Sequence, residues 1–369
     1  MTNEDYMRMA VELAKQGIGF VNPNPLVGAV IVKNGRIIGK GAHLRYGQLH
    51  AERNALADCT ESTDGADMYV TLEPCCHYGK NPPCTEAVIA SGIRRVFVGS
   101  YDPNPLVSGK GTAKLRAAGI RVTEGFLKEE CDALNDIFFH YITTKMPMVT
   151  MKYAMTADGK IAAYTGNSKW ITGESARLEV QQDRLRHAAI MVGIGTVLAD
   201  NPMLTCRLEG GRNPLRIVCD SKLKISPDCN IVRTAKEIPT IIACCADADM
   251  TRKSKLESLG CRVIVTDSRD GHVDLRQLME ILGSEQIDSV LLEGGSELNW
   301  SALECGIVSR IKAFIAPKIL GGKAAKSPVS GIGASSPDEG FRLTDTKIRT
   351  VGEDIIMESR VEYGVHGNN

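Results

Sequence analysis

The feature that most constrains the fold of this chain is an alternation of strand-like and helix-like segments that breaks once and then restarts. Such alternation predicts sheets covered by helices, so we expect an α/β protein. The break is "TTKMPM" (143–148), where Pro147 ends a helix. A chain of 369 residues is also too long for one ordinary domain. We therefore predict two α/β domains, residues 1–145 and 146–369.

The first half contains a strong hairpin signal, the dipeptide Asn34-Gly35 between the two β-rich runs of "VGAVIVKNGRIIGKGAH". Apolar residues at helical spacing predict a first helix that stops at Gly17. Further helices are predicted at 50–58, at 84–91 and in a segment that ends near Tyr141. Strands are predicted at "MYVTLEP", "RRVFVGS" and "IRVTEG".

The second half begins with a strand, "MVTMKYAMTADGKIA", that turns at Asp158-Gly159. A helix is predicted from Glu174 to His187. The remaining strands are predicted at "AIMVGIG", "LRIVCDS", "PTIIACC", "CRVIVTD", "DSVLLEGG" and "RIKAFIAPKIL", with a last pair around "VGED". No internal repeat relates the two halves, so they are predicted to be separate domains.

The net charge and the hydropathy of the chain argue against nucleic acid and membranes as binding partners. Lys and Arg total 44, as do Asp and Glu, so the net charge is zero. A neutral chain offers no general electrostatic attraction to nucleic acid or to a membrane surface. The first residues have no basic region leading into an apolar core, and no apolar run approaches the ~18 residues of a membrane span. We expect a cytoplasmic protein with neither nucleic acid nor membrane as partner.

Two motifs predict a catalytic metal. "HAERNAL" places Glu52 two residues after His50, and "LEPCCHYGKNPPC" follows with Cys75 at the end of a predicted strand. His-x-Glu followed by Pro-Cys is the arrangement of the zinc nucleobase deaminases, in which the glutamate shuttles protons and is not a ligand. Catalytic zinc takes three protein ligands and leaves its fourth position to water. The pattern therefore predicts zinc ligands at His50 and Cys75, with Glu52 as the proton carrier.

The third ligand is not at the usual place. A Pro-Cys-x-x-Cys motif would put it at Tyr78, where the side chain is unsuitable, so Cys76 or Cys84 must serve. Adjacent Cys75 and Cys76 would project in divergent directions from a short loop. Cys84 begins the next predicted helix and can return to the metal, and a helix N-terminus favours its thiolate. We predict Cys84 as the third ligand and Cys76 as a bystander.

The motifs "NPNPLVGAVIV", "GxHxxxGxxHAE" and "TLEPCCHYGKNPPC" resemble those of the bifunctional deaminase/reductase family of riboflavin biosynthesis. The resemblance covers essentially the whole chain. It implies a cytidine-deaminase-like three-layer α/β domain followed by a dihydrofolate-reductase-like α/β domain, with Zn²⁺ and NADPH as cofactors and a homo-oligomeric assembly. The implied substrate is a small phosphorylated pyrimidine, 2,5-diamino-6-(5-phosphoribosylamino)pyrimidin-4(3H)-one, which loses its 2-amino group. Substrate contacts are implied for Asn24, His43, His77, Lys80, Asp102 and Asn104.

In the second half, "LLEGGSELNWSAL" combines a buried strand, an acidic residue, a Gly-Gly turn and a helix. Glycines allow close approach of a ligand to the backbone, and a helix N-terminus offers unpaired amides to a phosphate. "VGIGTVLADNPMLTCR" supplies a second strand-glycine-loop combination. No G-x-G-x-x-G follows the first strand, so a Rossmann domain is not expected. The two combinations predict a cradle for a phosphorylated cofactor.

The order of motifs in this half resembles the reductase half of the same family, which opens the ribose and delivers hydride to C1′. By that resemblance Lys152, Asp200 and Glu293 assist the chemistry. Arg184 and Arg207 provide the forked donors that a phosphate favours, although Arg184 read alone would lie on a solvated helix face. The implied nucleotide contacts are Ala154, Trp170, Thr196, Asp200, Ser221, Gly295, Ser296, Glu297, Leu298, Asn299, Trp300 and Ser301. The implied sugar-phosphate contacts are Ser168, Arg184, Leu204, Arg207 and Glu293.

Two other functions agree less well with the sequence. A deaminase of free nucleosides or tRNA bases with an unrelated second domain is disfavoured by the neutral charge and by the long "CHYGKNPP" insertion. A zinc-stabilised binding protein that has lost catalysis would show a broken His50–Glu52 pair or a missing ligand, and the sequence shows neither.

Overall fold

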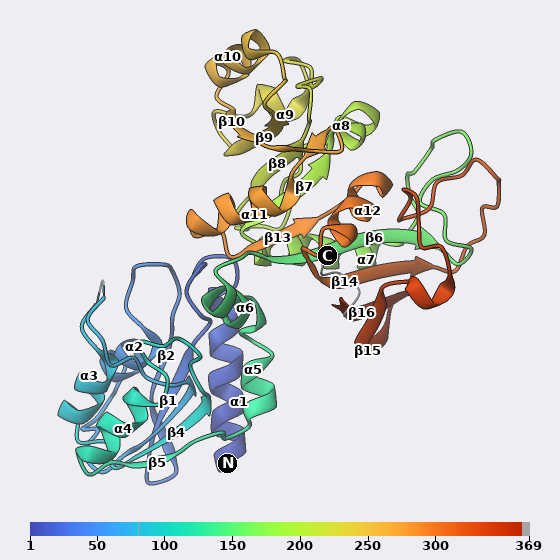
Figure 1. Ribbon diagram of the computed structural model, residues 1–369. Helices are drawn as coiled ribbons and strands as arrows, with labels where there is room; N and C mark the ends of the chain where they lie inside the picture. Colours follow the sequence, from blue (N-terminus) through green and yellow to red (C-terminus); the bar gives the residue numbers. More distant parts are fainter. Residues whose placement is uncertain (80, 364–369) are drawn as a thin grey trace. The chain divides into compact units, whose positions relative to one another are not determined.

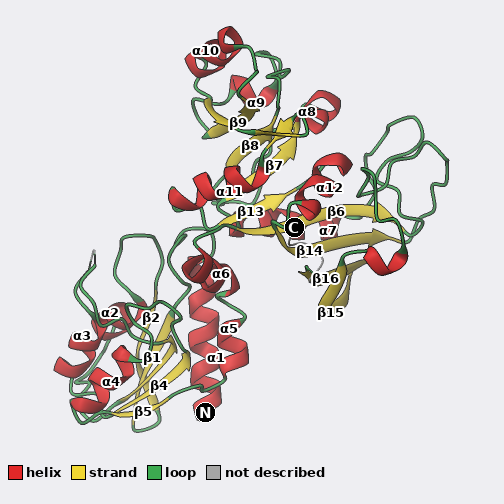
Figure 2. Ribbon diagram, viewed as in Figure 1, coloured by secondary structure: helices red, strands yellow, loops and turns green. Residues whose placement is uncertain are grey.

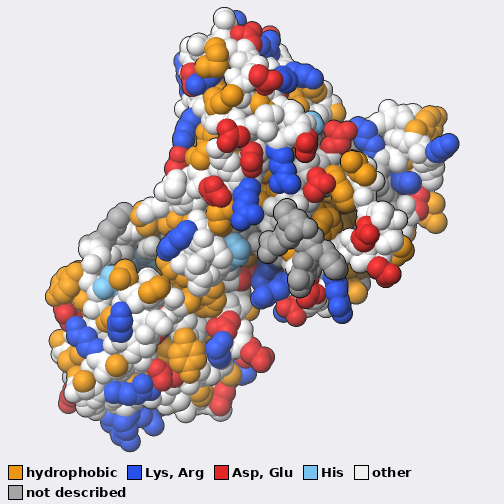
Figure 3. All heavy atoms as spheres, viewed as in Figure 1, with side chains coloured by type: hydrophobic (Ala, Val, Ile, Leu, Met, Phe, Trp, Pro, Cys, Tyr) orange, Lys and Arg blue, Asp and Glu red, His pale blue; other side chains and the backbone are white. Residues whose placement is uncertain are grey.

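The computed structural model describes residues 1–79 and 81–363. The chain divides into two compact units, Met1–Lys145 and Met146–Asn369. Each unit is a sheet with helices on both faces (Figures 1 and 2). Acidic and basic side chains both occur on the visible face of each unit (Figure 3). Within the described part of the chain, no helix is long and apolar enough to cross a membrane.

The first unit has five strands in the order β2-β1-β3-β4-β5. β1 pairs antiparallel with β2 and β3, while β3, β4 and β5 are parallel. Its elements are α1 (Asn3–Ala14), η1 (Lys15–Gly17), β1 (Gly28–Lys33), β2 (Arg36–Ala42), α2 (Ala51–Ala57), β3 (Asp67–Leu72), α3 (Cys84–Ala90), β4 (Arg95–Ser100), α4 (Lys110–Ala117), β5 (Arg121–Thr123), α5 (Lys128–Asp132) and α6 (Asp136–Thr144).

Strand alternation in this unit sends apolar side chains to two cores. Val30 of β1 and Tyr69 of β3 pack with α1 on one face, whereas Ile31 and Val70, the next residues along each strand, pack with α2, α3 and α4 on the other. The result is three layers. The predicted hairpin is confirmed, since β1 and β2 are joined by Asn34 and Gly35, both with positive φ.

The second unit is built on a nine-stranded sheet in the order β10-β9-β8-β7-β13-β6-β14-β16-β15. In that order the first seven strands, which begin with β10 and end with β14, are parallel to one another. β16 and β15 then add an antiparallel edge. Its elements are β6 (Met148–Thr156), α7 (Glu174–Arg186), β7 (Ala189–Gly193), α8 (Ile194–Asp200), β8 (Leu215–Cys219), α9 (Asn230–Arg233), β9 (Thr240–Cys245), α10 (Met250–Ser258), β10 (Arg262–Thr266), β11 (Ser268–Arg269), β12 (His272–Val273), α11 (Leu275–Ser284), β13 (Ser289–Leu292), α12 (Ser296–Glu304), β14 (Val308–Ala316), η2 (Pro337–Glu339), β15 (Arg342–Val351) and β16 (Asp354–Glu362).

Helices α11 and α12 pack on one face of this sheet against Met151 and its neighbours. Helices α8, α9 and α10 cover the other face, and α7 packs there against Phe314. One prediction is wrong in extent: the strand expected to reach Leu320 ends at Ala316. Pro317 has no N–H to continue the ladder, and the N–H groups of Leu320 and Gly321 donate to the carboxylate of Asp158 instead.

Candidate functional site

A cluster of one histidine and two cysteines lies at three element boundaries of the first unit. His50 directly precedes α2, Cys75 follows β3, and Cys84 begins α3. The Nδ1 atom of His50 lies 3.6 Å from Sγ of Cys75 and 3.4 Å from Sγ of Cys84. Tetrahedral zinc, with Zn–N near ~2.0 Å and Zn–S near ~2.3 Å, places nitrogen and sulfur ligands about 3.6 Å apart. The donor set and its spacing therefore fit a zinc ion. Cys76 points elsewhere, toward the carbonyl of Leu106.

Charges around this cluster suit proton transfer. Glu52, in the first turn of α2, is buried, and burial raises its pKa to about 7. A carboxyl group with that pKa both accepts and releases protons near neutral pH. The contact between the two thiols lowers the pKa of Cys75 to about 4 and raises that of Cys84. One of the two sulfurs therefore carries a thiolate readily, as a zinc ligand must.

The structure brings Asn24 and His43 to the same place. His43 is buried, and its ring meets that of His50 edge-on at 5.3 Å between centroids. Its Nε2 lies 3.3 Å from Nδ2 of Asn24, and its Nδ1 lies 3.1 Å from the carbonyl oxygen of Leu49. Burial lowers the pKa of His43, which favours the neutral ring. The pair therefore presents a fixed polar edge beside the cluster.

Three further predicted substrate residues lie in the loops after β3 and β4. The Nδ1 atom of His77 is buried and has no hydrogen-bond partner among the residues that the structure describes. Burial raises the pKa of Asp102 to about 6, with smaller contributions from Glu73 and Cys75. Asp102 accepts a hydrogen bond from the N–H of Asn104 at 2.8 Å. Lys80 lies outside the described residues.

Sequence reasoning missed Glu73, the buried residue at the end of the "MYVTLE" run. Its Oε1 accepts hydrogen bonds from the N–H groups of Gly111 (2.9 Å) and Thr112 (3.1 Å), and its Oε2 accepts one from Gly109 (3.0 Å). Glu73 thus joins the strand that leads to Cys75 to the N-terminus of α4 and to the loop that carries Asp102. The available signal was a carboxylate that ends an otherwise apolar strand.

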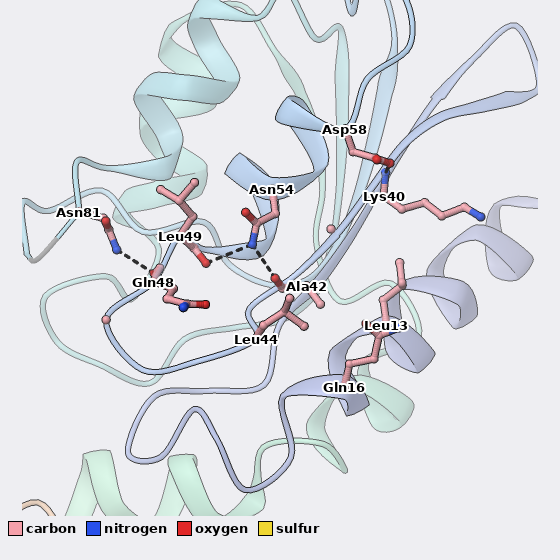
Figure 4. A pocket seen from close by; sticks show the side chains of 12 residues that line it. Leu13, Gln16, Lys40, Ala42, Leu44, Gln48, Leu49, Asn54, Asp58 and Asn81 are labelled. Carbon is pink, nitrogen blue, oxygen red and sulfur yellow. Dashed lines mark hydrogen bonds between the residues drawn. The ribbon is translucent and has the colours of Figure 1, made fainter. Parts of the chain in front are cut away.

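Asn54, the last polar residue of "HAERNAL", fixes the loop between the two histidines. Its Nδ2 donates to the carbonyl oxygens of Ala42 (2.8 Å) and Leu49 (3.3 Å), which directly precede His43 and His50 (Figure 4). A cavity of about 660 Å³ opens beside this loop. None of the predicted site residues lines it; the lining is Leu13, Gln16, Lys40, Gly41, Ala42, Leu44, Gly47, Gln48, Leu49, Asn54, Asp58 and Asn81.

The two predicted glycine loops of the second unit, with Thr196 and Asn299, lie at one edge of its sheet. β8, β7, β13 and β6 are parallel neighbours, so the segments after them lie at their shared carboxyl edge, where ligands of open α/β sheets bind. The N–H of Gly193 donates to the carbonyl of Gly294 at 2.9 Å, which joins the two glycine loops. A Cβ on Gly295 would lie 3.6 Å from the hydroxyl of Thr196. The Oδ1 atom of Asn299 is buried without a partner among the described residues. Open glycine backbone and an unsatisfied polar atom fit a phosphorylated cofactor.

Other predicted cofactor residues have partners already. The hydroxyl of Ser221, after β8, accepts from the N–H of Val273 at 3.2 Å. Trp170 is exposed, and the guanidinium of Arg177 lies 4.7 Å from the centroid of its indole ring. Asp200 is exposed at the C-terminal end of α8. Within the described part of the chain, no hydrogen bond or ion pair connects Asp200 with Lys152.

Of the remaining nucleotide contacts implied by the family, Ala154 packs with Phe314 under α7. Trp300 meets Phe341 edge-on at 5.9 Å. Among the sugar-phosphate contacts, Leu204 is buried and Ser168 is half-buried. These four residues therefore stand in different surroundings, and their contacts with a ligand stay predictions.

The structure differs from expectation at Arg184. Its Nε and one terminal nitrogen each lie 2.8 Å from an oxygen of Glu293, and the other terminal nitrogen donates to the carbonyl of Thr205. The side chains of the pair are only 13% and 11% exposed, so Arg184 lies on no solvated helix face. Its forked donors are occupied by a carboxylate, which leaves the exposed Arg207 as the forked donor available to a phosphate.

The ion pair sets the charges around Lys152. Burial alone would raise the pKa of Glu293, but Arg184 and Lys152 outweigh it and lower that pKa to about 2. Burial lowers the pKa of Lys152, and the charge of Glu293 opposes this. Glu293 is therefore an anion at neutral pH, whereas Lys152 is a lysine that releases its proton more easily than usual.

Known families match both halves of the chain. Residues 147–357 match the RibD C-terminal domain, and residues 1–100 match the cytidine and deoxycytidylate deaminase zinc-binding region. The riboflavin biosynthesis protein RibD of Actinobacillus pleuropneumoniae is 57% identical over 358 residues, which cover 97% of this chain and 95% of that protein. The protein of the same name from Escherichia coli is 38% identical over 371 residues, with 97% and 99% covered.

Solved structures agree with the sequence matches. A Thermotoga maritima diaminohydroxyphosphoribosylaminopyrimidine deaminase/5-amino-6-(5-phosphoribosylamino)uracil reductase superposes with a TM-score of 0.83 at 38% identity, covering 97% of this chain and 98% of that one. RibD of Acinetobacter baumannii gives a TM-score of 0.86 at 34% identity, with 98% and 99% covered. The predicted fold class, a cytidine-deaminase-like domain followed by a dihydrofolate-reductase-like domain, is confirmed.

Proposed function

The chain belongs to the RibD family, the bifunctional deaminases and reductases of riboflavin biosynthesis, and on that premise we propose how its residues carry out the two reactions. Residues 1–145 form the deaminase and residues 146–369 the reductase. The substrate is the diaminopyrimidine nucleotide after which the Thermotoga relative is named. The observation that carries the first reaction is the cluster of His50, Cys75 and Cys84 with Glu52 buried beside it.

The first reaction is the hydrolysis of 2,5-diamino-6-(5-phosphoribosylamino)pyrimidin-4(3H)-one to 5-amino-6-(5-phosphoribosylamino)uracil and ammonia. His50, Cys75 and Cys84 hold zinc, which when bound supplies the Lewis acidity that activates water. Glu52 takes one proton from the attacking water and passes it to the ring nitrogen. It then takes the proton of the new C2 hydroxyl group and gives it to the amine, so that the C–N bond breaks, ammonia leaves and the C2 carbonyl forms. A pKa of about 7 suits this carboxyl group to both directions of transfer.

Side chains around the cluster orient the pyrimidine. His43 and Asn24 offer neutral hydrogen-bonding groups, and Asp102 and Asn104 offer an acceptor and an amide from the loop after β4. The unpaired Nδ1 of His77 supports a contact with the substrate, because a buried polar atom without a partner is costly unless a ligand satisfies it. Lys80 is assigned to the phosphate on the family resemblance alone.

The second reaction reduces the ribosyl group to ribityl. The glycine loops at Gly193 and Gly294 hold NADPH, which when bound supplies the hydride. Lys152 donates the proton that the opening ribose ring requires, and Glu293 holds Arg184 in an ion pair. Arg207 binds the phosphate of the substrate. Asp200 and Trp170 are proposed to contact NADPH because the chain resembles the reductase half of the family.

The deaminase assignment is tested with Glu52→Gln in the full chain. Loss of a positioned proton carrier lowers rates by roughly 10²–10⁴-fold. We expect ammonia release to fall by that factor while zinc content, measured by elemental analysis, stays at the wild-type value. NADPH oxidation with the deaminated pyrimidine should be unchanged. Glu86→Gln, which alters an exposed glutamate on α3, is the matched control. Equal ammonia release by wild type and Glu52→Gln would remove Glu52 from the mechanism.

A further inference from the structure

A row of charged side chains crosses the sheet of the second unit on the face covered by α7. Lys152 on β6 is the register partner of Lys312 on β14, and Lys312 is the register partner of Glu358 on β16. Glu293 directly follows β13, the neighbour of β6 on its other side. The two lysines are therefore adjacent, and both ammonium groups lie over the ring of Phe314, at 5.7 Å and 5.5 Å.

The two lysines differ in the number of carboxylates close to their ammonium groups. The Nζ atom of Lys312 lies 2.8 Å from Asp183, 3.5 Å from Glu179 and 3.6 Å from Glu358. Lys152 has no ion pair with any described residue. The acid nearest to it in the row, Glu293, is held by both forked donors of Arg184. Two lysines in equivalent strand positions thus have opposite surroundings.

The groups that face Lys152 come from every element packed around it. Glu293 stands at the end of β13, Asp183 and Arg184 on α7, and Lys312 on β14. The Oδ2 atom of Asp183 is buried without a partner among the described residues, while its Oδ1 binds Lys312. If the Lys312 ammonium were absent, Lys152 and Arg186 would be the cations left to act on the charge of Asp183.

We propose that Lys312 is a positioning residue of the reductase, which holds Asp183 and thereby keeps Lys152 without a counter-ion. A buried ammonium group without a counter-ion gives up its proton more readily than an exposed one. This inference rests on the proposed role of Lys152 as proton donor. In that reaction the C1′–O4′ bond of the ribosyl group breaks, and its electron pair stays on O4′. The new C1′–H bond takes the hydride that NADPH would supply when bound, Lys152 protonates O4′, and solvent returns a proton to Lys152.

The test uses the full chain with Lys312→Met, Lys312→Arg and the double variant Lys312→Met/Asp183→Asn. The first readout is independent of turnover: acetic anhydride labelling of Lys152 as a function of pH, read by mass spectrometry, gives the midpoint of its deprotonation. The second readout is the pH dependence of the reductase kcat. Ammonia release by the same molecules serves as an internal control. Lys255→Met, which alters an exposed lysine on α10 outside this row, is the matched lysine control.

Lys312→Met removes a like charge and frees Asp183, so the Lys152 midpoint should rise by about one unit or more. In the plot of the reductase kcat against pH, the part that depends on the protonation of Lys152 should shift to higher pH by the same amount. The KM for NADPH and the rate of ammonia release should stay at wild-type values. Lys312→Arg should restore the wild-type midpoint, and so should the added Asp183→Asn change. Lys255→Met should leave the midpoint and the kcat profile unchanged.

An unmoved midpoint in Lys312→Met, or a shift that Asp183→Asn does not reverse, overturns the inference. If Lys312→Met does not fold, Asp183→Asn alone decides, because removal of an acid that faces Lys152 should lower the midpoint. No change in that variant overturns the inference as well. A shifted midpoint with an unshifted kcat profile upholds the arrangement of charges and refutes the proton-transfer role given to Lys152, so the two failures are distinguishable.

Discussion

Replacing Glu73 by glutamine should destabilise the deaminase unit although the two side chains have nearly the same shape. The carboxylate accepts three backbone hydrogen bonds, two on Oε1 and one on Oε2. In Glu73→Gln the retained oxygen still accepts from Gly111 and Thr112, but without charge. The new amide group donates toward the N–H of Gly109, which is also a donor, so that contact is lost.

The magnitude follows from these contacts. A hydrogen bond to a charged group contributes about 1.5–3 kcal/mol and a neutral one about 0.5–1.5 kcal/mol. Two weakened bonds at roughly 1 kcal/mol each and one lost bond at roughly 1–2 kcal/mol give about 3–4 kcal/mol. For a domain of this size each kcal/mol lowers Tm by about 2–4 °C, so the unit should melt roughly 10 °C lower. The charge of Glu73 also helps to raise the pKa of Asp102, so the pKa of that residue should fall.

Residual activity after heating provides an assay for each unit in one protein. Ammonia release reports the first unit and NADPH oxidation the second, and only the first should be lost at a lower temperature in Glu73→Gln. Glu86→Gln is the control, since the Glu86–Lys114 ion pair is exposed to solvent and contributes little to stability. If the first units of Glu73→Gln and Glu86→Gln melt at the same temperature, Glu73 does not hold the N-terminus of α4.

Two further predictions concern the two sites. Cys84→Ser should lose zinc by elemental analysis and stop releasing ammonia, whereas Cys76→Ser should keep both; zinc loss from Cys76→Ser instead would exchange the roles of the two cysteines. Glu293→Gln leaves the buried Arg184 without its anion and should destabilise the reductase unit by about 3–5 kcal/mol at neutral pH. Because the pKa of Glu293 is about 2 in the fold, below its ordinary value of 4.5, its stabilisation is present above pH 4.5 and fades as the pH falls toward 2. The stability difference between Glu293→Gln and wild type, followed by denaturant unfolding, should therefore shrink over that window, and a constant difference would contradict the assignment.

Local patterns in the sequence predicted much of the architecture. Asn34-Gly35 is a hairpin because both positions require positive φ, and α7 begins at the expected Glu174. His50 and Glu52 lie at the start of one helix, α2, so local structure alone brings them close together. Such features depend on residues close together in the chain, and for these the preferences of the backbone are sufficient. The extent of β14 was overestimated because Asp158, more than 150 residues earlier, takes the N–H groups after its end.

Side-chain type and local spacing are enough to identify the residues that could perform the chemistry, because they fix what His50, Glu52 and the cysteines are able to do. The partners of the charged residues, in contrast, follow from long-range packing alone. Arg184 binds Glu293 across 109 positions of the chain, and Lys312 meets Asp183 across 129. Periodicity reveals the face of a strand on which a side chain lies, but not which strand is its neighbour. The order β13-β6-β14-β16 is not sequential, so only the folded sheet could place one lysine among carboxylates and leave the other without one.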